Sequence, residues 1–185
     1  LANTMYASEH QGHYAPAAPD IYANNGGLTR WHGARERADE EFDPDKGLLA
    51  EYLPDKRVKA CPVFTEYMTK SQAPNAFESG TGGYGYNMAY IGSTRFRAND
   101  YPMDAKTYTT PASKNTTRDS EVGNPSETIM FADSALAQDG YVIEYGFLEP
   151  PYYASSDNPT GNEDWGLSSP SLHFRHNGRV TVIWC

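Results

Sequence analysis

The residues able to carry chemistry are few in this sequence, and no two of them stand at catalytic spacing. His173 and His176 are three residues apart on a predicted strand, so their side chains should point to opposite faces and cannot both bind one metal ion. We expect His176 to hold the turn that follows it by hydrogen bonds, and Asp133 to cap the end of an earlier strand. Nucleophile-elbow, phosphate-loop, Cys-x-x-Cys and His-Glu-x-x-His motifs are all absent from the sequence. The sequence therefore predicts no catalytic residue and no enzyme.

One loop combines the hard oxygen donors that calcium prefers. Asp157, Asn158, Asn162 and Asp164, together with Glu163, lie close together in a long acidic stretch before the C-terminus. Calcium takes about six to eight oxygen ligands, often from a flexible loop. The cluster predicts a calcium site with Asp157 and Asp164 as its main ligands, and a loop that is merely solvated is the alternative. No other cofactor is expected.

Composition limits the classes of partner. The chain has 185 residues, of which 15 are basic and 24 acidic, giving a net charge of −9. Its length predicts a single domain over 1–185. An acidic surface disfavours nucleic acid, which needs a basic binding surface. It also disfavours contact of this domain with an anionic membrane surface.

The order of predicted elements indicates an α+β domain. Residues 1–11 carry a short helical pattern, and a second helix should begin at Asp43 as N-cap with Pro44 in its first turn and end at Pro54. We expect the first helix to lean across an antiparallel sheet. The strands predicted for this domain are 84–91, 128–132, 141–147 and the two strands of a terminal hairpin over 173–185, with all but the first assigned to that sheet.

The strongest local signal lies near the C-terminus. Asn177-Gly178 predicts a type I′ turn, because both central residues of that turn need a positive φ. The β-branched and aromatic run 180–184 predicts a strand buried on both faces. The chain should therefore end in a β-hairpin.

This hairpin resembles the C-terminal hairpin of a large bacterial family of prepilin-like, pseudopilin-type proteins. In that family a His is followed by nine residues and then Asp-Gly, and here His176 is followed by the nine residues 177–185. The family's basic leader and apolar segment are not in this sequence, so we expect it to be the globular head, as a fragment or a processed form. Other segments that resemble the family, in the same order, are 1–16, where its long N-terminal helix ends, 42–54 with Cys61-Pro62, 84–88 and 124–134.

The resemblance implies a non-catalytic structural subunit of a pilus-like or type II secretion pseudopilus-like assembly. Its partners would be other pilin-like subunits, joined through the missing N-terminal hydrophobic helix. That helix would anchor the precursor in the inner membrane, and the head would act through its surface in the periplasm or outside the cell. Some major pseudopilins carry calcium in their C-terminal loop region, which favours the calcium prediction for 157–164.

A protein of a different class is the alternative. An exported carbohydrate- or peptide-binding module would use tyrosine rings, which suit stacking on sugars. A secreted hydrolase has no visible pair of nucleophile and base. The tyrosines proposed for such a binding site are Tyr84, Tyr86, Tyr90, Tyr101, Tyr108, Tyr145, Tyr152 and Tyr153.

The two cysteines leave two states open. An exported protein can form a disulfide between Cys61 and Cys185. Two separate thiols are the alternative, because the sequence does not give the short Cα separation that a disulfide requires.

Overall fold

The computed structural model describes residues 1–185 apart from 24–25, 72–77, 95–112, 139 and 149–170. Within these described residues, two α-helices, α1 (Ala2–Glu9) and α2 (Pro62–Ser71), accompany several small antiparallel sheets. The predicted α+β class is therefore confirmed. In the described part of the chain, neither helix has the length and apolar content needed to cross a membrane.

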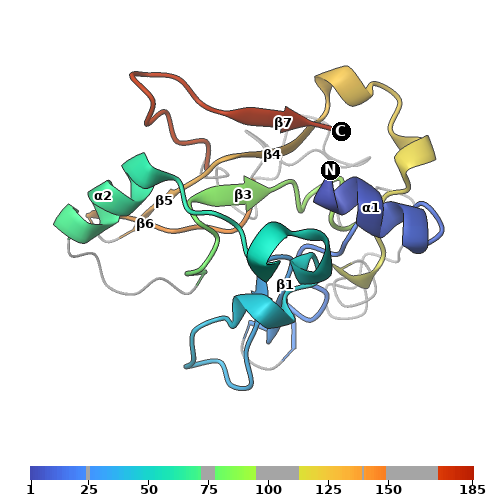
Figure 1. The fold of residues 1–185 in the computed structure, drawn as a ribbon, viewed down its shortest axis with the longest axis horizontal. Coiled ribbons are helices and arrows are strands. Elements are labelled where there is room, and N and C mark those ends of the chain that lie inside the picture. The colour runs from blue at the N-terminus through green and yellow to red at the C-terminus, as the bar shows by residue number, and fades with distance from the viewer. Residues whose placement is uncertain (24–25, 72–77, 95–112, 139, 149–170) are drawn as a thin grey trace, which may run out of the picture.

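The main sheet has three strands in the order β3-β4-β7, all antiparallel. These strands are β3 (Tyr84–Tyr86), β4 (Ile129–Asp133) and β7 (Val182–Trp184). In Figure 1, α1 lies at the end of the sheet where β7 ends, and α2 lies towards the opposite end. The start of α1 and the C-terminus lie close together in that view.

Helix α1 is fixed to the sheet by a buried polar contact. Asn3 is buried on α1, and its Nδ2 donates to the hydroxyl of Tyr86 at 2.8 Å while its Oδ1 accepts from the N–H of Ala15 at 2.9 Å. Tyr86 is fully buried on β3, and its ring stacks on Phe131 with 4.6 Å between centroids. The predicted helix within 1–11, held against the sheet, is confirmed.

The assignment of 141–147 to the main sheet is wrong. β6 (Tyr141–Ile143) pairs with β5 (Leu136–Gln138) in a separate two-stranded sheet. The two strands are sequence neighbours and form a short antiparallel pair in which Gln138 faces Tyr141. The end of the predicted strand reaches the main sheet at an isolated parallel bridge between Phe147 and Tyr86 on β3. The strand predicted over 84–91 also ends early, because the chain turns after β3 with the N–H of Ile91 bonded to the carbonyl of Asn87.

The terminal hairpin is confirmed at its turn and wrong in its strands. Asn177 and Gly178 have φ of 54° and 76°, and His176 and Arg179 exchange both backbone hydrogen bonds. Residues 173–176 do not form a strand, since they are engaged with Asp133 and with this turn. β7 pairs instead with β4.

The prediction that the last strand is buried on both faces is also wrong. Ile183 and Trp184 on β7 are 49% and 48% exposed. A β-branched and aromatic run indicates a strand, but it does not indicate how many of its faces are covered.

The helix predicted over 43–54 is replaced by separate 3-10 turns. Asp43 does act as N-cap, with its Oδ1 accepting from the N–H of Asp45 at 3.0 Å. Gly47 then leaves helical geometry, where a Cβ would lie 2.7 Å from the backbone of His32. The 3-10 segments are Pro44–Lys46, Ala50–Tyr52, Pro54–Lys56, Asp119–Glu121 and Pro125–Glu127, and the remaining strands are β1 (Thr29–Arg30) and β2 (Gly33–Ala34).

Candidate functional site

Asp133, the last residue of β4, joins the C-terminal segment to the main sheet. Its side chain is fully buried, with Oδ1 accepting from Nη2 of Arg175 at 2.9 Å and Oδ2 accepting from the N–H of Thr181 at 2.6 Å. Its backbone bonds to Thr181 and His173 as well. Burial alone would raise the pKa of Asp133, but these donors outweigh it and hold the pKa below its usual range. The carboxylate is therefore charged near neutral pH. It does not only cap the end of its own strand, as predicted from the sequence, but also binds the C-terminal segment through Arg175 and Thr181.

Arg175 is the buried ionic partner of the Asp133 carboxylate. Its side chain is only 3% exposed, and its guanidinium lies over the ring of Phe64 at 4.6 Å from the centroid. Nη2 also donates to the carbonyl of Gly83 and Nη1 to that of Ser134. A buried ion pair of this kind is sensitive to the loss of either partner, because the other is then left charged and desolvated.

Gly83 has no side chain, and the space beside it is filled by Phe64 and Arg175. It has a φ of +86°, and a Cβ there would lie 2.6 Å from Cδ1 of Phe64 and 2.9 Å from Nη1 of Arg175. We expect Gly83→Ala to reduce the free energy of unfolding by about 1–3 kcal/mol through this strain and contact. Gly123→Ala is the matched control, because nothing lies within 4 Å of its added Cβ. Equal urea midpoints for the two variants would contradict this account of Gly83.

Cys61 approaches the same carboxylate from another element. It stands directly before α2, is 2% exposed, and its N–H donates to the carbonyl of Gly82 at 2.9 Å. Its carbonyl accepts from the N–H of Thr65 at 2.9 Å in the first turn of the helix. The start of α2 therefore fixes the position of the thiol.

His176 completes a cluster of three side chains, Cys61, Asp133 and His176. Its Nε2 lies 3.6 Å from Sγ of Cys61 and 3.4 Å from Oδ2 of Asp133. In the described part of the chain, this is the group of Cys, His and acidic side chains whose candidate ligand atoms all lie within 4.8 Å of one another. The prediction that no polar residue has a partner at catalytic spacing is wrong at this point.

The cluster nevertheless lacks the geometry of a nucleophile relay. In such a relay the imidazole contacts the nucleophile through one ring nitrogen and the orienting carboxylate through the other. Here Nε2 of His176 faces both the thiol and the carboxylate. Sulfur, nitrogen and oxygen donors instead converge on one point, which is an arrangement of metal ligands.

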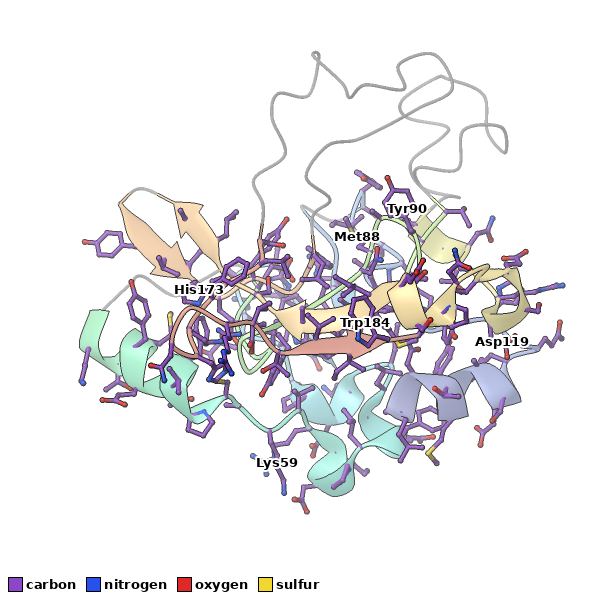
Figure 2. All side chains as sticks on the ribbon, turned by 90° about the horizontal axis from the view of Figure 1, so that it is seen from above. Lys59, Met88, Tyr90, Asp119, His173 and Trp184 are labelled. Atoms are coloured by element: carbon purple, nitrogen blue, oxygen red, sulfur yellow. The ribbon has the colours of Figure 1, made fainter. Side chains whose placement is uncertain are left out.

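His173 does not join this cluster. Its ring meets Phe64 and Tyr67 edge-on at 6.2 Å between centroids, beside α2 as in Figure 2. Burial, followed by the charge of Arg175, lowers the pKa of His173. The two histidines thus have separate sites as predicted, although the predicted reason, a regular strand, is wrong.

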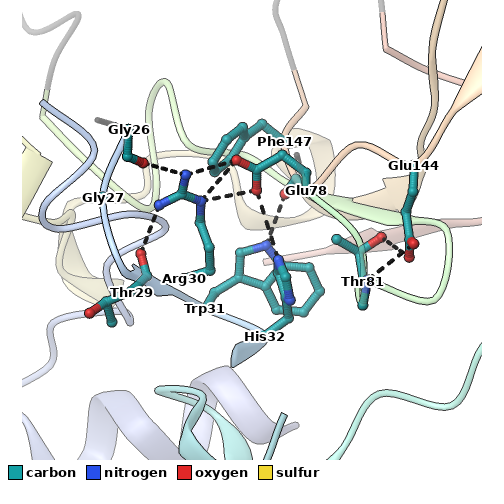
Figure 3. Close-up of polar contacts among 12 residues, drawn as sticks. Gly26, Gly27, Thr29, Arg30, Trp31, His32, Glu78, Thr81, Glu144 and Phe147 are labelled. Atoms are coloured by element: carbon teal, nitrogen blue, oxygen red, sulfur yellow. Dashed lines mark hydrogen bonds and ion pairs between the residues drawn. The ribbon is translucent and has the colours of Figure 1, made fainter. Parts of the chain in front are cut away.

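A second buried charge cluster, which the sequence did not reveal, lies among Arg30, His32 and Glu78 (Figure 3). Nη2 of Arg30 donates to Oε1 of Glu78 at 2.8 Å, and Nε lies 3.0 Å from both carboxylate oxygens. Nε2 of His32 is 3.9 Å from Oε2 of Glu78. All three side chains are nearly inaccessible to solvent, so the cluster has a structural role in joining β1 to the segment around Glu78.

The remaining site predictions fall in different places. The calcium ligands predicted from the sequence, Asp157, Asn158, Asn162 and Asp164, lie outside the described residues. Cys61 and Cys185 are free thiols, so no disulfide joins them in this structure. Burial raises the pKa of Cys185 to about 11.

The tyrosines of the alternative binding module do not form one surface in the part of the structure that is described. Tyr86 is fully buried and belongs to the core, while Tyr90 is exposed. Tyr145 is partly buried and meets the buried ring of Phe147 edge-on at the border of the core. The tyrosines of this set that lie outside the described residues are Tyr101, Tyr108, Tyr152 and Tyr153.

Comparison with known proteins returns no match: no protein-family model, no curated protein and no solved structure is similar to this chain at a significant level.

Proposed function

We propose that this chain is the head of a non-catalytic structural subunit of a pilus-like or pseudopilus-like assembly. In this proposal α1 is the end of a longer hydrophobic helix, which anchors the subunit in the inner membrane before assembly. The head works in the periplasm or outside the cell, through contacts with neighbouring subunits. The observation that carries the proposal is an uncharged apolar groove where α1 begins beside β7. The resemblance of the sequence to prepilin-like proteins supports the same function.

The groove lies between the first turn of α1 and the main sheet and has a volume of about 330 Å³. Ile183 and Trp184 on its border are 49% and 48% exposed. Figure 2 places Trp184 on β7, at the front edge of the sheet in that view. No lining residue carries a charged side chain; they are Leu1, Ala2, Asn3, Thr4, Trp31, Leu49, Leu53, Val58, Tyr84, Met130, Phe131, Ile183 and Trp184.

We assign this groove to a neighbouring copy of the same chain. Two molecules that each carry a net charge of −9 repel one another, so a stable contact between them favours a surface without charge. β7 adds a strand edge that has no second neighbour among the described strands, and such edges pair readily with other chains. Exposed apolar patches bordered by polar surface are typical of protein interfaces.

The double variant Ile183→Ser/Trp184→Ser tests this interface. Loss of a tryptophan at an interface commonly costs about 2 kcal/mol or more, so we expect subunit association to weaken by about thirtyfold or more. The measurement is the fraction of the complete protein recovered in sedimenting filaments from cells that produce it. Both side chains also bury about half of their surface in the isolated chain, so its thermal midpoint is measured beside assembly to confirm that the variant is folded under the conditions of the assay.

Tyr141→Ser is the matched control, because Tyr141 is 45% exposed on β6, away from the groove. It should assemble like the unchanged protein. If the double variant assembles normally, the groove is not the interface. If the unchanged protein is recovered only as free monomer and binds a sugar or peptide, it is an exported binding module and the proposed function is wrong.

A further inference from the structure

We propose that Cys61, Asp133 and His176 form a zinc site with three protein ligands and an open fourth position. The donors are Sγ of Cys61, Oδ2 of Asp133 and Nε2 of His176. This inference does not depend on the proposed function, and it concerns residues separate from the acidic loop for which calcium was predicted.

Two of the three distances between donor atoms match those around a tetrahedral zinc ion. With Zn–S of about 2.3 Å and Zn–N or Zn–O of about 2.0–2.1 Å, tetrahedral geometry separates S from N by about 3.5 Å and N from O by about 3.3 Å. The corresponding separations here are 3.6 Å, from Cys61 to His176, and 3.4 Å, from His176 to Asp133. All the donor atoms lie within 4.8 Å of one another, so one ion can reach them.

The surroundings orient the aspartate as a ligand. Arg175 binds Oδ1, and the N–H of Thr181 binds Oδ2, which keeps a second lone pair for a metal. Hydrogen bonds of this kind to a ligating carboxylate fix its direction and its charge. The guanidinium places a positive charge near the site, but a thiolate and a carboxylate together offset it.

The combination of donors selects the class of metal. Thiolate and imidazole suit zinc and related transition metals, whereas calcium prefers oxygen ligands throughout. Cys61 and Asp133 are buried, while His176 is 36% exposed and opens the cluster to solvent on one side. A water molecule can therefore fill the fourth position, as it does in zinc sites with three protein ligands.

A zinc ion here would join three parts of the chain that are distant in sequence. Cys61 precedes α2, Asp133 ends β4, and His176 stands in the turn before β7. The two most distant ligands in the sequence, Cys61 and His176, are 115 positions apart. In a chain whose two cysteines are unpaired, the metal would take the place of a disulfide as a tie for the C-terminal segment.

Zinc titration of the whole chain, stripped with chelator beforehand, tests the proposal. We expect saturable binding of one zinc ion and a rise in the thermal midpoint that chelator reverses. Cobalt in place of zinc should give a thiolate-to-cobalt charge-transfer band. Mutation of a residue that only hydrogen-bonds to a metal ligand lowers metal affinity by about 10–100-fold. Cys61→Ser and His176→Asn each remove a ligand itself, so we expect each to lower the zinc affinity by more than this. The partly exposed His176 makes the second variant informative even if the first fails to fold.

The matched controls are Cys185→Ser and His173→Asn, which change the other cysteine and the neighbouring histidine. Both should bind zinc as the unchanged chain does. The proposal is overturned if the unchanged chain shows no saturable zinc binding, if cobalt gives no thiolate band, or if His176→Asn binds zinc as tightly as His173→Asn. Equal loss in Cys61→Ser and Cys185→Ser would also overturn it, because that is the behaviour of nonspecific thiol binding.

Discussion

Asp133→Ala is expected to lower the free energy of unfolding by about 3–5 kcal/mol, measured by urea denaturation in the presence of chelator. The substitution leaves Arg175 charged and desolvated, since its side chain is only 3% exposed and Asp133 is its ionic partner. It also removes the acceptor for the N–H of Thr181. Both losses fall on the contact between β4 and the segment that leads into β7, so we expect this segment to detach first.

The pair Arg37–Asp39 provides a matched control. Its atoms are as close, at 2.7 Å, but both side chains are about two thirds exposed. Asp39→Ala should therefore change stability little, because water and salt screen such pairs. The double variant Asp133→Ala/Arg175→Met should recover part of the loss by removing the unpaired charge. Equal urea midpoints for Asp133→Ala and Asp39→Ala would contradict the role given to the buried pair.

Glu78→Ala is expected to have an effect of similar size, about 3–5 kcal/mol, in the second buried charge cluster. Glu78 is the carboxylate partner of the fully buried Arg30, whose guanidinium also donates to the carbonyls of Thr29 and Gly26. Glu78→Gln keeps the shape of the side chain and should lose less. Urea denaturation near neutral pH measures both variants.

The same carboxylate should make stability depend on pH. Burial would raise the pKa of Glu78, but His32 and Arg30 outweigh it and hold the pKa below the usual value. The stabilisation is therefore complete above the ordinary Glu pKa of about 4.3 and is lost as the pH falls through the lower pKa of the folded state. Below about pH 4, the unchanged protein should lose stability more steeply than Glu78→Gln.

Glu66→Gln is the control for the acid titration, because Glu66 forms an exposed pair with Lys70 on α2. Its stability curve should follow that of the unchanged protein. A Glu78→Gln curve that is equally steep below pH 4 would show that another group accounts for the acid sensitivity.

Local signals in the sequence predicted local structure well. The Asn177-Gly178 turn, the strand predicted over 128–132 and observed as Ile129–Asp133, and the cap at Asp43 each depend on residues that are neighbours in the chain. The start of α1 within 1–11 was predicted for the same reason. Helix α2 was missed, although Pro62 at its start and the apolar pair Phe64 and Met68 at helical spacing give a readable pattern.

The candidate site depends on contacts that no local pattern contains. Cys61 and His176 are 115 residues apart and meet only because β4 places Asp133 between α2 and the terminal turn. Arg30 and Glu78 likewise pair across 48 residues. The exposure of β7 is a further case, since it depends on which elements cover a strand and not on the residues of the strand itself.

The N-terminal peptide of the mature protein, isolated from the cells that make it and analysed by mass spectrometry, tests the proposed function most directly. A pilus-like subunit should begin with a methylated apolar residue, followed by an apolar helix that leads into α1. The protein should then be found in membranes or in sheared filaments. An unmethylated N-terminus left by an ordinary secretion signal, on a protein recovered wholly in the soluble exported fraction, would contradict the account.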